Sequence, residues 1–354
     1  MNSRRLGLSV VNVAAAILSA SLISCGSPII EGALPGECVD SIDNDEDGLI
    51  DCADPDCITR GYCDGDITET GFTIDTGGPE ICDPCESGTD GWIYVSAGEE
   101  TSCGIRPTDL GMCWGDPSDG QADIPQDVAF SQLDMGWDHG CGVDNDGLLH
   151  CWGENFADKA TPPNGSYTYV SVGKYNSCAV KTTGDLVCWG SPEYGMTTPP
   201  QGAFESVSVG FNHACAVASD GSVECWGESQ DGKTTAATGS YSAVATGATA
   251  SCGLSMSGSI LCWGSSTYGQ TNPPQGVYTA IDMSHTGGGC ALDTDGVVAC
   301  WGELHDEHGA VAAVDTPDEE FTAIDVGPQH ACGLTTDGSI VCWGSNESGK
   351  ASAP

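Results

Sequence analysis

The cysteines and carboxylates are the residues of this chain best suited to chemistry. The sequence holds 21 cysteines, and 51 acidic residues against nine Lys and Arg give a formal net charge of -42. Fourteen cysteines stand in seven pairs whose members are ten positions apart. These pairs are Cys103 with Cys113, Cys141 with Cys151, Cys178 with Cys188, Cys215 with Cys225, Cys252 with Cys262, Cys290 with Cys300, and Cys332 with Cys342. Such cysteines either form disulfides or pack as reduced, buried thiols.

Each cysteine pair flanks the sequence pattern of a β-hairpin. In the last copy, opposing the two cysteines places Leu334 across from Ile340 and leaves residues 336–338 as the loop. A three-residue hairpin loop ends in a residue with positive φ, usually Gly, and Gly338 stands there. The first copy has Asp109 instead, which tolerates positive φ better than most residues. Because the spacing is even, both thiols point to one face, and we expect seven disulfides.

The second cysteine of each pair begins the tripeptide Cys-Trp-Gly, and its seven copies are 37 to 42 residues apart. Such a regular period indicates a repeat architecture. Upstream of each hairpin, alternating segments such as 169–173 and 321–327 predict a strand that ends at Gly, except in the sixth repeat, which has Ser284 there. Pro-rich connectors such as 197–202 fit loops or sheet edges. Each unit therefore has three or four short antiparallel strands. Seven four-stranded units would close into a β-propeller, and an open β-solenoid is the alternative.

The pattern His-Ala-Cys-Gly-Leu, Asp-Gly, Val-Cys-Trp-Gly at 330–344 resembles the repeat of the RCC1-like (regulator of chromosome condensation) superfamily. The resemblance covers residues 91–354 and implies an all-β fold, a seven-bladed β-propeller. It also implies protein–protein binding, since the superfamily includes extracellular members that inhibit enzymes. The best-known member acts on a small GTPase and chromatin. We do not transfer that activity, because so acidic a chain repels phosphate backbones and disfavours nucleic acid as a partner.

The first residues read as an export signal. Arg4 and Arg5 precede an apolar stretch that ends in Leu22-Ile23-Ser24-Cys25. This ending resembles a bacterial lipobox, in which the Cys is acylated. We therefore expect residues 1–24 to be a lipoprotein signal peptide and Cys25 to carry the lipid. An ordinary signal peptide or an uncleaved anchor is the alternative. The prediction is an exported, membrane-anchored lipoprotein of the bacterial cell envelope, on the outer membrane or surface.

Residues 25–63 form an acidic, cysteine-rich segment with a predicted calcium loop. In 43–54, side-chain oxygens fall at loop positions 1, 3, 5, 9 and 12 of an EF-hand-type loop, with Gly48 at position 6. The expected ligands are Asp43, Asp45, Asp47, the Leu49 carbonyl, Asp51 and Asp54. Without helical flanks, the segment resembles the thrombospondin type 3 class of calcium repeats. Hard oxygen ligands favour calcium over zinc, and a solvated acidic linker is the alternative.

Six further cysteines remain once Cys25 is assigned to the lipid. They are Cys38, Cys52, Cys57, Cys63, Cys82 and Cys85, an even set that fits disulfides of unassigned connectivity in an oxidising compartment. Residues 64–90 are rich in Thr, Gly and Asp and lack apolar periodicity, which predicts a flexible acidic linker.

The histidines offer little catalytic signal. His139, His213 and His330 each precede a hairpin's first cysteine by two residues, so we expect them to pack or hydrogen-bond as part of the repeat frame. His305 and His308 lie in the longest interval and could hold a metal, or be a solvated loop cluster. The chain lacks a Gly-x-Ser-x-Gly element and a phosphate-binding loop.

We therefore expect a non-enzymatic, lipid-anchored protein whose propeller binds, or inhibits, a protein partner through a loop-built face. Two alternatives remain at this point. An enzyme acting on surface polysaccharide or peptidoglycan would need a deep central pocket with two carboxylates and a perturbed pKa. A purely structural envelope component would show no isolated functional patch. The sequence leaves open how residues 92–98 meet the C-terminal residues to close the ring.

Overall fold

The computed structural model describes residues 91–306, 309–312 and 316–354, and Gly91–Pro354 forms one compact unit. The predicted signal peptide, Cys25, the predicted calcium loop, the six cysteines from Cys38 to Cys85 and His308 lie outside the described residues. Within the described ranges, no helix has the length and apolar character needed to cross a membrane.

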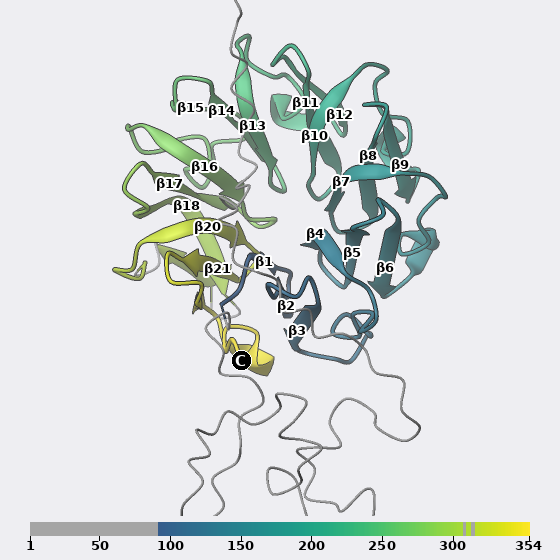
Figure 1. The fold of residues 1–354 in the computed structure, drawn as a ribbon. Coiled ribbons are helices and arrows are strands. Elements are labelled where there is room, and N and C mark those ends of the chain that lie inside the picture. The colour runs from purple at the N-terminus through teal and green to yellow at the C-terminus, as the bar shows by residue number, and fades with distance from the viewer. Residues whose placement is uncertain (1–90, 307–308, 313–315) are drawn as a thin grey trace, which may run out of the picture. The chain divides into compact units, whose positions relative to one another are not determined.

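The described residues form seven antiparallel sheets, the blades, arranged around a central axis with their first strands innermost (Figure 1). The first strands are β1 (Tyr94–Ala97), β4 (Phe130–Met135), β7 (Tyr167–Val172), β10 (Phe204–Val209), β13 (Tyr241–Thr246), β16 (Tyr278–Met283) and β20 (Phe321–Val326). The second strands are β2 (Thr101–Ile105), β5 (His139–Asp144), β8 (Asn176–Lys181), β11 (His213–Ala218), β14 (Ala250–Ser255), β17 (Gly288–Asp293) and β21 (His330–Thr335). The third strands are β3 (Gly111–Gly115), β6 (Leu149–Gly153), β9 (Leu186–Gly190), β12 (Val223–Gly227), β15 (Ile260–Gly264), β18 (Val298–Asp306) and β22 (Ile340–Gly344).

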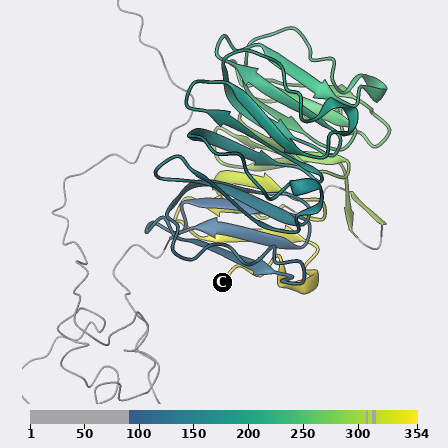
Figure 2. The same ribbon diagram turned by 90° about the vertical axis from the view of Figure 1, so that its right-hand side faces the viewer.

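Six of the seven described sheets have three strands each, the lower of the two counts expected for a unit. Only the sixth blade has a fourth strand, because β18 continues beyond the repeat and β19 (Gly309–Ala312) pairs with it. Figure 2 shows this hairpin projecting beyond the neighbouring blades. In the other blades the Pro-rich connectors stay outside the sheets, since Pro cannot donate to a ladder. Short 3-10 turns follow four third strands, namely η2 (Phe156–Asp158), η3 (Glu193–Gly195), η4 (Gln230–Gly232) and η5 (Glu347–Gly349).

The hairpins have the predicted register. Leu334 lies opposite Ile340 across β21 and β22. Gly338, at the end of the loop between them, has φ +87°, and Asp109 at the same place in the first blade has φ +64°. The turn chemistry read from the sequence therefore holds even where Gly is replaced.

All fourteen cysteines of the ring are joined as the ten-residue spacing indicated, across the second and third strands of each blade, with Cα atoms 4.0 or 4.1 Å apart. The disulfides are Cys103 to Cys113, Cys141 to Cys151, Cys178 to Cys188, Cys215 to Cys225, Cys252 to Cys262, Cys290 to Cys300, and Cys332 to Cys342. The alternative of reduced, buried thiols is wrong for these residues. That alternative also required buried cysteines, but the second cysteine is only half-buried in six blades, and Cys188 alone is buried.

The core lies between blades. Between the first two blades, for example, Phe130, Leu133 and Trp152 pack with Cys103 and Ile105, and all five are buried. In six of the seven blades the tryptophan of Cys-Trp-Gly also ties the blade to a connector or, in the first blade, to the C-terminal segment. Its indole Nε1 donates to a backbone carbonyl there: Trp114 to Lys350, Trp152 to Gln121, Trp189 to Lys159, Trp226 to Met196, Trp263 to Lys233 and Trp301 to Gln270. These six indole N–H groups are thereby satisfied, whereas the buried Nε1 of Trp343 makes no hydrogen bond within the described residues.

The ring closes by packing of the first blade on the last, where Trp92 and Val95 cluster with Leu334 and Ile340. Trp92 N donates to the Gly338 carbonyl at 2.6 Å. Lys350 is fully buried, and its Nζ lies 3.0 Å from Glu100 Oε2. Its carbonyl accepts a hydrogen bond from Trp114 Nε1 at 2.9 Å. The C-terminal residues therefore provide the carbonyl that accepts the tryptophan N–H of the first blade, as connectors do for five other blades.

Candidate functional site

The loops between first and second strands converge at one end of the ring. Each loop is tight: Gly136 N donates to the His139 carbonyl, and Gly173 N donates to the Asn176 carbonyl, both at 2.9 Å. A Cβ on Gly136 would overlap the carbonyl oxygen of Gly173 in the next blade. Glycine at this point lets neighbouring loops touch through their backbones. The residues that follow each Gly are therefore held side by side on a rigid rim.

Three of these loops present an aromatic cluster with a lysine in it. The ring centroids of Trp137 and Phe211 are 5.7 Å apart, and those of Tyr175 and Phe211 are 5.5 Å apart, with nearly perpendicular planes. Lys174 Nζ lies 3.5 Å from the Trp137 centroid and 4.6 Å from that of Phe211, within cation–π range. All four side chains are half-buried. We call Trp137, Lys174, Tyr175 and Phe211 the aromatic face.

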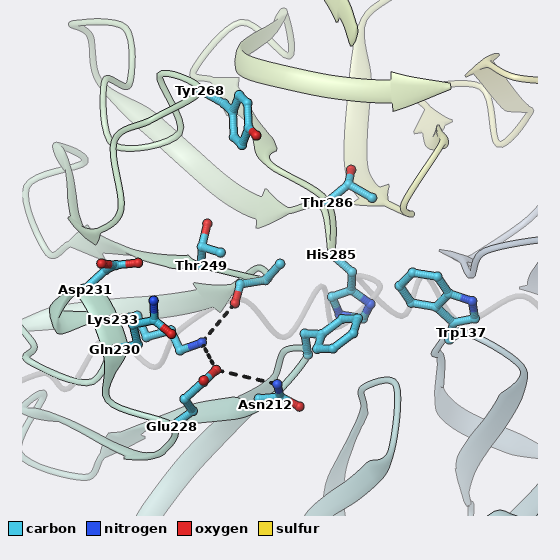
Figure 3. Close-up of a pocket in the computed structure, with 12 residues that line it drawn as sticks. Trp137, Asn212, Glu228, Gln230, Asp231, Lys233, Thr249, Tyr268, His285 and Thr286 are labelled. Atoms are coloured by element: carbon cyan, nitrogen blue, oxygen red, sulfur yellow. Dashed lines mark hydrogen bonds and ion pairs between the residues drawn. The ribbon is translucent and has the colours of Figure 1, made fainter. Parts of the chain in front are cut away.

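A pocket of about 580 Å³ adjoins the aromatic face and shares Trp137 and Phe211 with it. Glu228 Oε2 lies 2.5 Å from Lys233 Nζ and accepts a longer bond from Asn212 Nδ2 at 3.5 Å. Figure 3 shows Tyr268 and Thr286 across the pocket from Glu228 and Asn212. The remaining lining residues are Gln230, Asp231, Ala248, Thr249 and His285. The pocket thus combines aromatic rings with hydrogen-bonding and charged groups.

The pocket is acidic at neutral pH. The hydrogen bond from Lys233 holds the pKa of Glu228 below its usual range, so this carboxylate is ionised. Burial lowers the pKa of His285 to about 4, which keeps the imidazole neutral. The pocket therefore holds the carboxylates of Glu228 and Asp231 against one ammonium, that of Lys233.

Three further carboxylates, Asp134, Asp282 and Asp325, occupy one repeat position in their first strands. Burial raises the pKa of Asp134 to about 8 and that of Asp325 to about 6, and it raises the pKa of Asp282 as well. Each accepts a backbone N–H of the next blade, such as Val172 N on Asp134 at 2.6 Å. None of the three lines the pocket of Figure 3. Their observed contacts join blades.

The repeat-frame histidines hydrogen-bond between blades, as expected from their place in the repeat. Nε2 of His139, His213 and His330 lies 2.9, 2.7 and 2.6 Å from a serine Oγ of the adjacent blade, and all three rings are buried. His305 lies in β18, where its backbone pairs with Ala310. Within the part of the chain that the structure describes, no group of three or more His, Cys, Asp or Glu residues could hold a metal ion.

The aromatic face was not predicted from the sequence. Its residues follow the end of the first strand, where six repeats have Gly and the sixth has Ser284. The residue that comes first after this point changes from one repeat to the next: Glu99, Trp137, Lys174, Phe211, Ala248, His285 and Pro328. Variation at a fixed place in an otherwise regular repeat was the available signal, because a residue that serves only the fold tends to recur in every copy.

Five segments of the ring match the regulator of chromosome condensation (RCC1) repeat: residues 130–157, 167–195, 204–233, 241–270 and 321–350. The seven blades and these matches define a β-propeller built of RCC1-like repeats.

Solved structures share the fold. The CRINKLY WD40 ectodomain of the Arabidopsis thaliana receptor kinase ACR4 is similar with a TM-score of 0.61 and 24% identity, over 72% of this chain and 97% of that one. The ectodomain of the Physcomitrella patens receptor kinase CR4 gives 0.61 and 23%, over 72% and 73%. Human WBSCR16 gives 0.55 and 15%, over 67% and 84%. No curated protein matches the sequence.

Proposed function

We propose that this chain is a non-enzymatic, lipid-anchored protein of a bacterial cell envelope whose propeller binds a protein partner through the aromatic face. The observation that carries the proposal is the half-buried cluster of Trp137, Tyr175 and Phe211 at one end of the ring. Trp and Tyr are enriched among the residues that dominate binding energy at protein interfaces. Rigid loops also reduce the entropy that an interface loses on binding.

The membrane attachment in this proposal is supported by the sequence ending Leu22-Ile23-Ser24-Cys25. Residues 64–90 would then serve as the stalk between the lipid and the ring, with calcium bound by residues 43–54. An oxidising location beyond the inner membrane is consistent with the seven disulfides of the ring. Inhibition of an enzyme is one form that such binding could take.

Two observations weigh against the rival functions. A purely structural component needs no aromatic cluster confined to three loops, yet the cluster is present. An enzyme acting on glycans needs carboxylates that face a substrate pocket. Here Asp134, Asp282 and Asp325, three carboxylates whose pKa values burial raises, accept hydrogen bonds from neighbouring blades, which gives them a structural role.

Photo-crosslinking in native envelopes tests the proposal. Benzoylphenylalanine replaces Tyr175 in the full chain, and the matched control carries it at Met256, which is 63% exposed in the hairpin turn at the opposite end of its blade. We expect a protein adduct from position 175 and none from 256. The proposal fails when position 175 yields no protein adduct, and turnover of a glycan or peptide by the wild-type chain would then favour the enzyme.

A further inference from the structure

The basic groups of the ring are nearly all covered. Lys159, Lys233 and Lys350 are buried, each in an ion pair with at least one carboxylate. Arg106 lies 4.5 Å from the Trp92 ring centroid, and Lys174 lies over Trp137. The only other basic residue of 91–354 is Lys181. A partner therefore meets a surface dominated by carboxylates, so a basic partner is favoured.

The pocket beside the aromatic face likewise has exposed negative charge and a covered basic group. The ammonium of Lys233 is engaged by Glu228 and by the Ala248 carbonyl at 3.3 Å. His285 is neutral at neutral pH because burial lowers its pKa. Asp231 is exposed on the pocket wall. Away from Trp137, over which the Lys174 ammonium lies, the charge left for an incoming group is therefore negative.

Aromatic rings at this site already accept an ammonium. Lys174 Nζ lies within 5 Å of the centroids of both Trp137 and Phe211 but is not part of the pocket lining. The same two side chains line the pocket, together with Tyr268, which is 46% exposed. Aromatic surface beside a carboxylate is the combination that recognises a lysine or arginine side chain.

We infer that this pocket takes a lysine or arginine side chain from a basic segment of the partner protein, with the cation against Tyr268 and near Asp231. The inference rests on the proposed function, because it names the partner chemistry of the same end of the ring. A protein segment fits better than a free small cation, since Trp137 and Phe211 belong both to the pocket and to the aromatic face. A chain that covers the face can therefore extend a side chain into the pocket.

The ring supplies matched controls through its own repeat. Asp119 and Tyr194 stand four residues after a strand-ending Gly115 or Gly190, as Asp231 and Tyr268 stand after Gly227 and Gly264. Neither control residue lines the pocket. Asp231 has φ +59°, which Asn adopts readily, so Asp231→Asn removes charge without backbone strain.

The test measures the affinity of the full chain for a fluorescein-labelled octa-arginine peptide by fluorescence anisotropy at ~150 mM salt. We expect Tyr268→Ala and Asp231→Asn each to weaken binding about three- to fivefold, as a lost cation–π contact or ion pair does. Tyr194→Ala and Asp119→Asn should stay within about twofold of wild type. Equal affinity of the pocket variants and wild type overturns the inference, and so does an equal loss in all four variants.

A second arm separates this inference from the proposed function. Crosslinking from position 175 is repeated in chains carrying Tyr268→Ala or Asp231→Asn. An adduct as strong as that of the unaltered chain, with octa-arginine affinity also unchanged, overturns the cation pocket and leaves the binding face standing. An adduct that weakens in step with peptide affinity supports both. Absence of an adduct from the chain that carries only the crosslinker at position 175 refutes the proposed function. It also refutes the inference that a partner's lysine or arginine occupies the pocket.

Discussion

Replacing Asp134 by Asn should stabilise the ring by an amount that grows with pH. Burial, with a further contribution from Asp325, raises the pKa of Asp134 to about 8 in the folded chain. An aspartate in an unfolded chain has a pKa of about 3.9. Between these values the folded state keeps a proton that the unfolded state has released, so stability falls as pH rises. Asn carries no such proton and removes this loss.

The magnitude follows from the width of that window. At pH 7 the window spans about three pH units, which corresponds to at most about 4 kcal/mol. Relaxation and the effective dielectric of protein sites reduce the expected gain to about 1–2 kcal/mol. The Asn amide oxygen can still accept the bond from Val172 N, which is 2.6 Å from Asp134 Oδ2. In the next blade Ser171 makes the equivalent bond to Val209 N at 3.1 Å with a neutral hydroxyl, so charge is not needed there.

Urea unfolding followed by tryptophan fluorescence measures this gain. All nine tryptophans lie in 91–354, so the signal reports the ring alone. The difference in unfolding free energy between Asp134→Asn and wild type should be near zero at pH 4, rise through pH 6 and level off near pH 8. Titrating groups that do not interact with Asp134 are common to both chains and cancel in the difference. Loss of the Asp134 charge also removes one cause of the raised pKa of Asp282, which adds to the gain at high pH. Asp146→Asn, in an exposed turn, is the control and should change stability by less than about 0.5 kcal/mol at every pH. A difference that is independent of pH, or one that favours wild type above pH 6, would refute the reasoning.

Two further predictions concern the buried histidines and the calcium loop. Burial lowers the pKa of His213 to about 3, below the unfolded value near 6.5, so its contribution to stability is full above pH 6.5 and is lost as the pH falls towards 3. His213→Asn, which copies Asn176 of another blade, should reduce the fall in urea midpoint between pH 7 and 4.5; an undiminished fall would contradict this. Isothermal titration should show calcium binding to the full chain that is lost in the double variant Asp45→Ala, Asp47→Ala but kept in Asp64→Ala, Asp66→Ala. Unchanged affinity in the first variant would remove the calcium prediction.

The sequence by itself determined the blade. An even cysteine spacing and a loop ending at Gly338 or Asp109 decide which residues face each other, because strand alternation and turn geometry act over a few residues. The number of strands per blade was left at three or four. A Pro-rich connector is compatible with a sheet edge or a loop, and the folded blades leave it outside the sheet.

Only the tertiary structure decided what the blades do together. Trp137 and Phe211 come from different repeats, and their contact exists only once the blades lie side by side. The same holds for the buried Lys350 at the ring closure and for the raised pKa of Asp134, which depends on burial among several strands. Local pattern fixes a hairpin because its partners are near in sequence. A binding face built from loops of separate blades depends on contacts between residues far apart in the chain, which a repeat period alone does not specify.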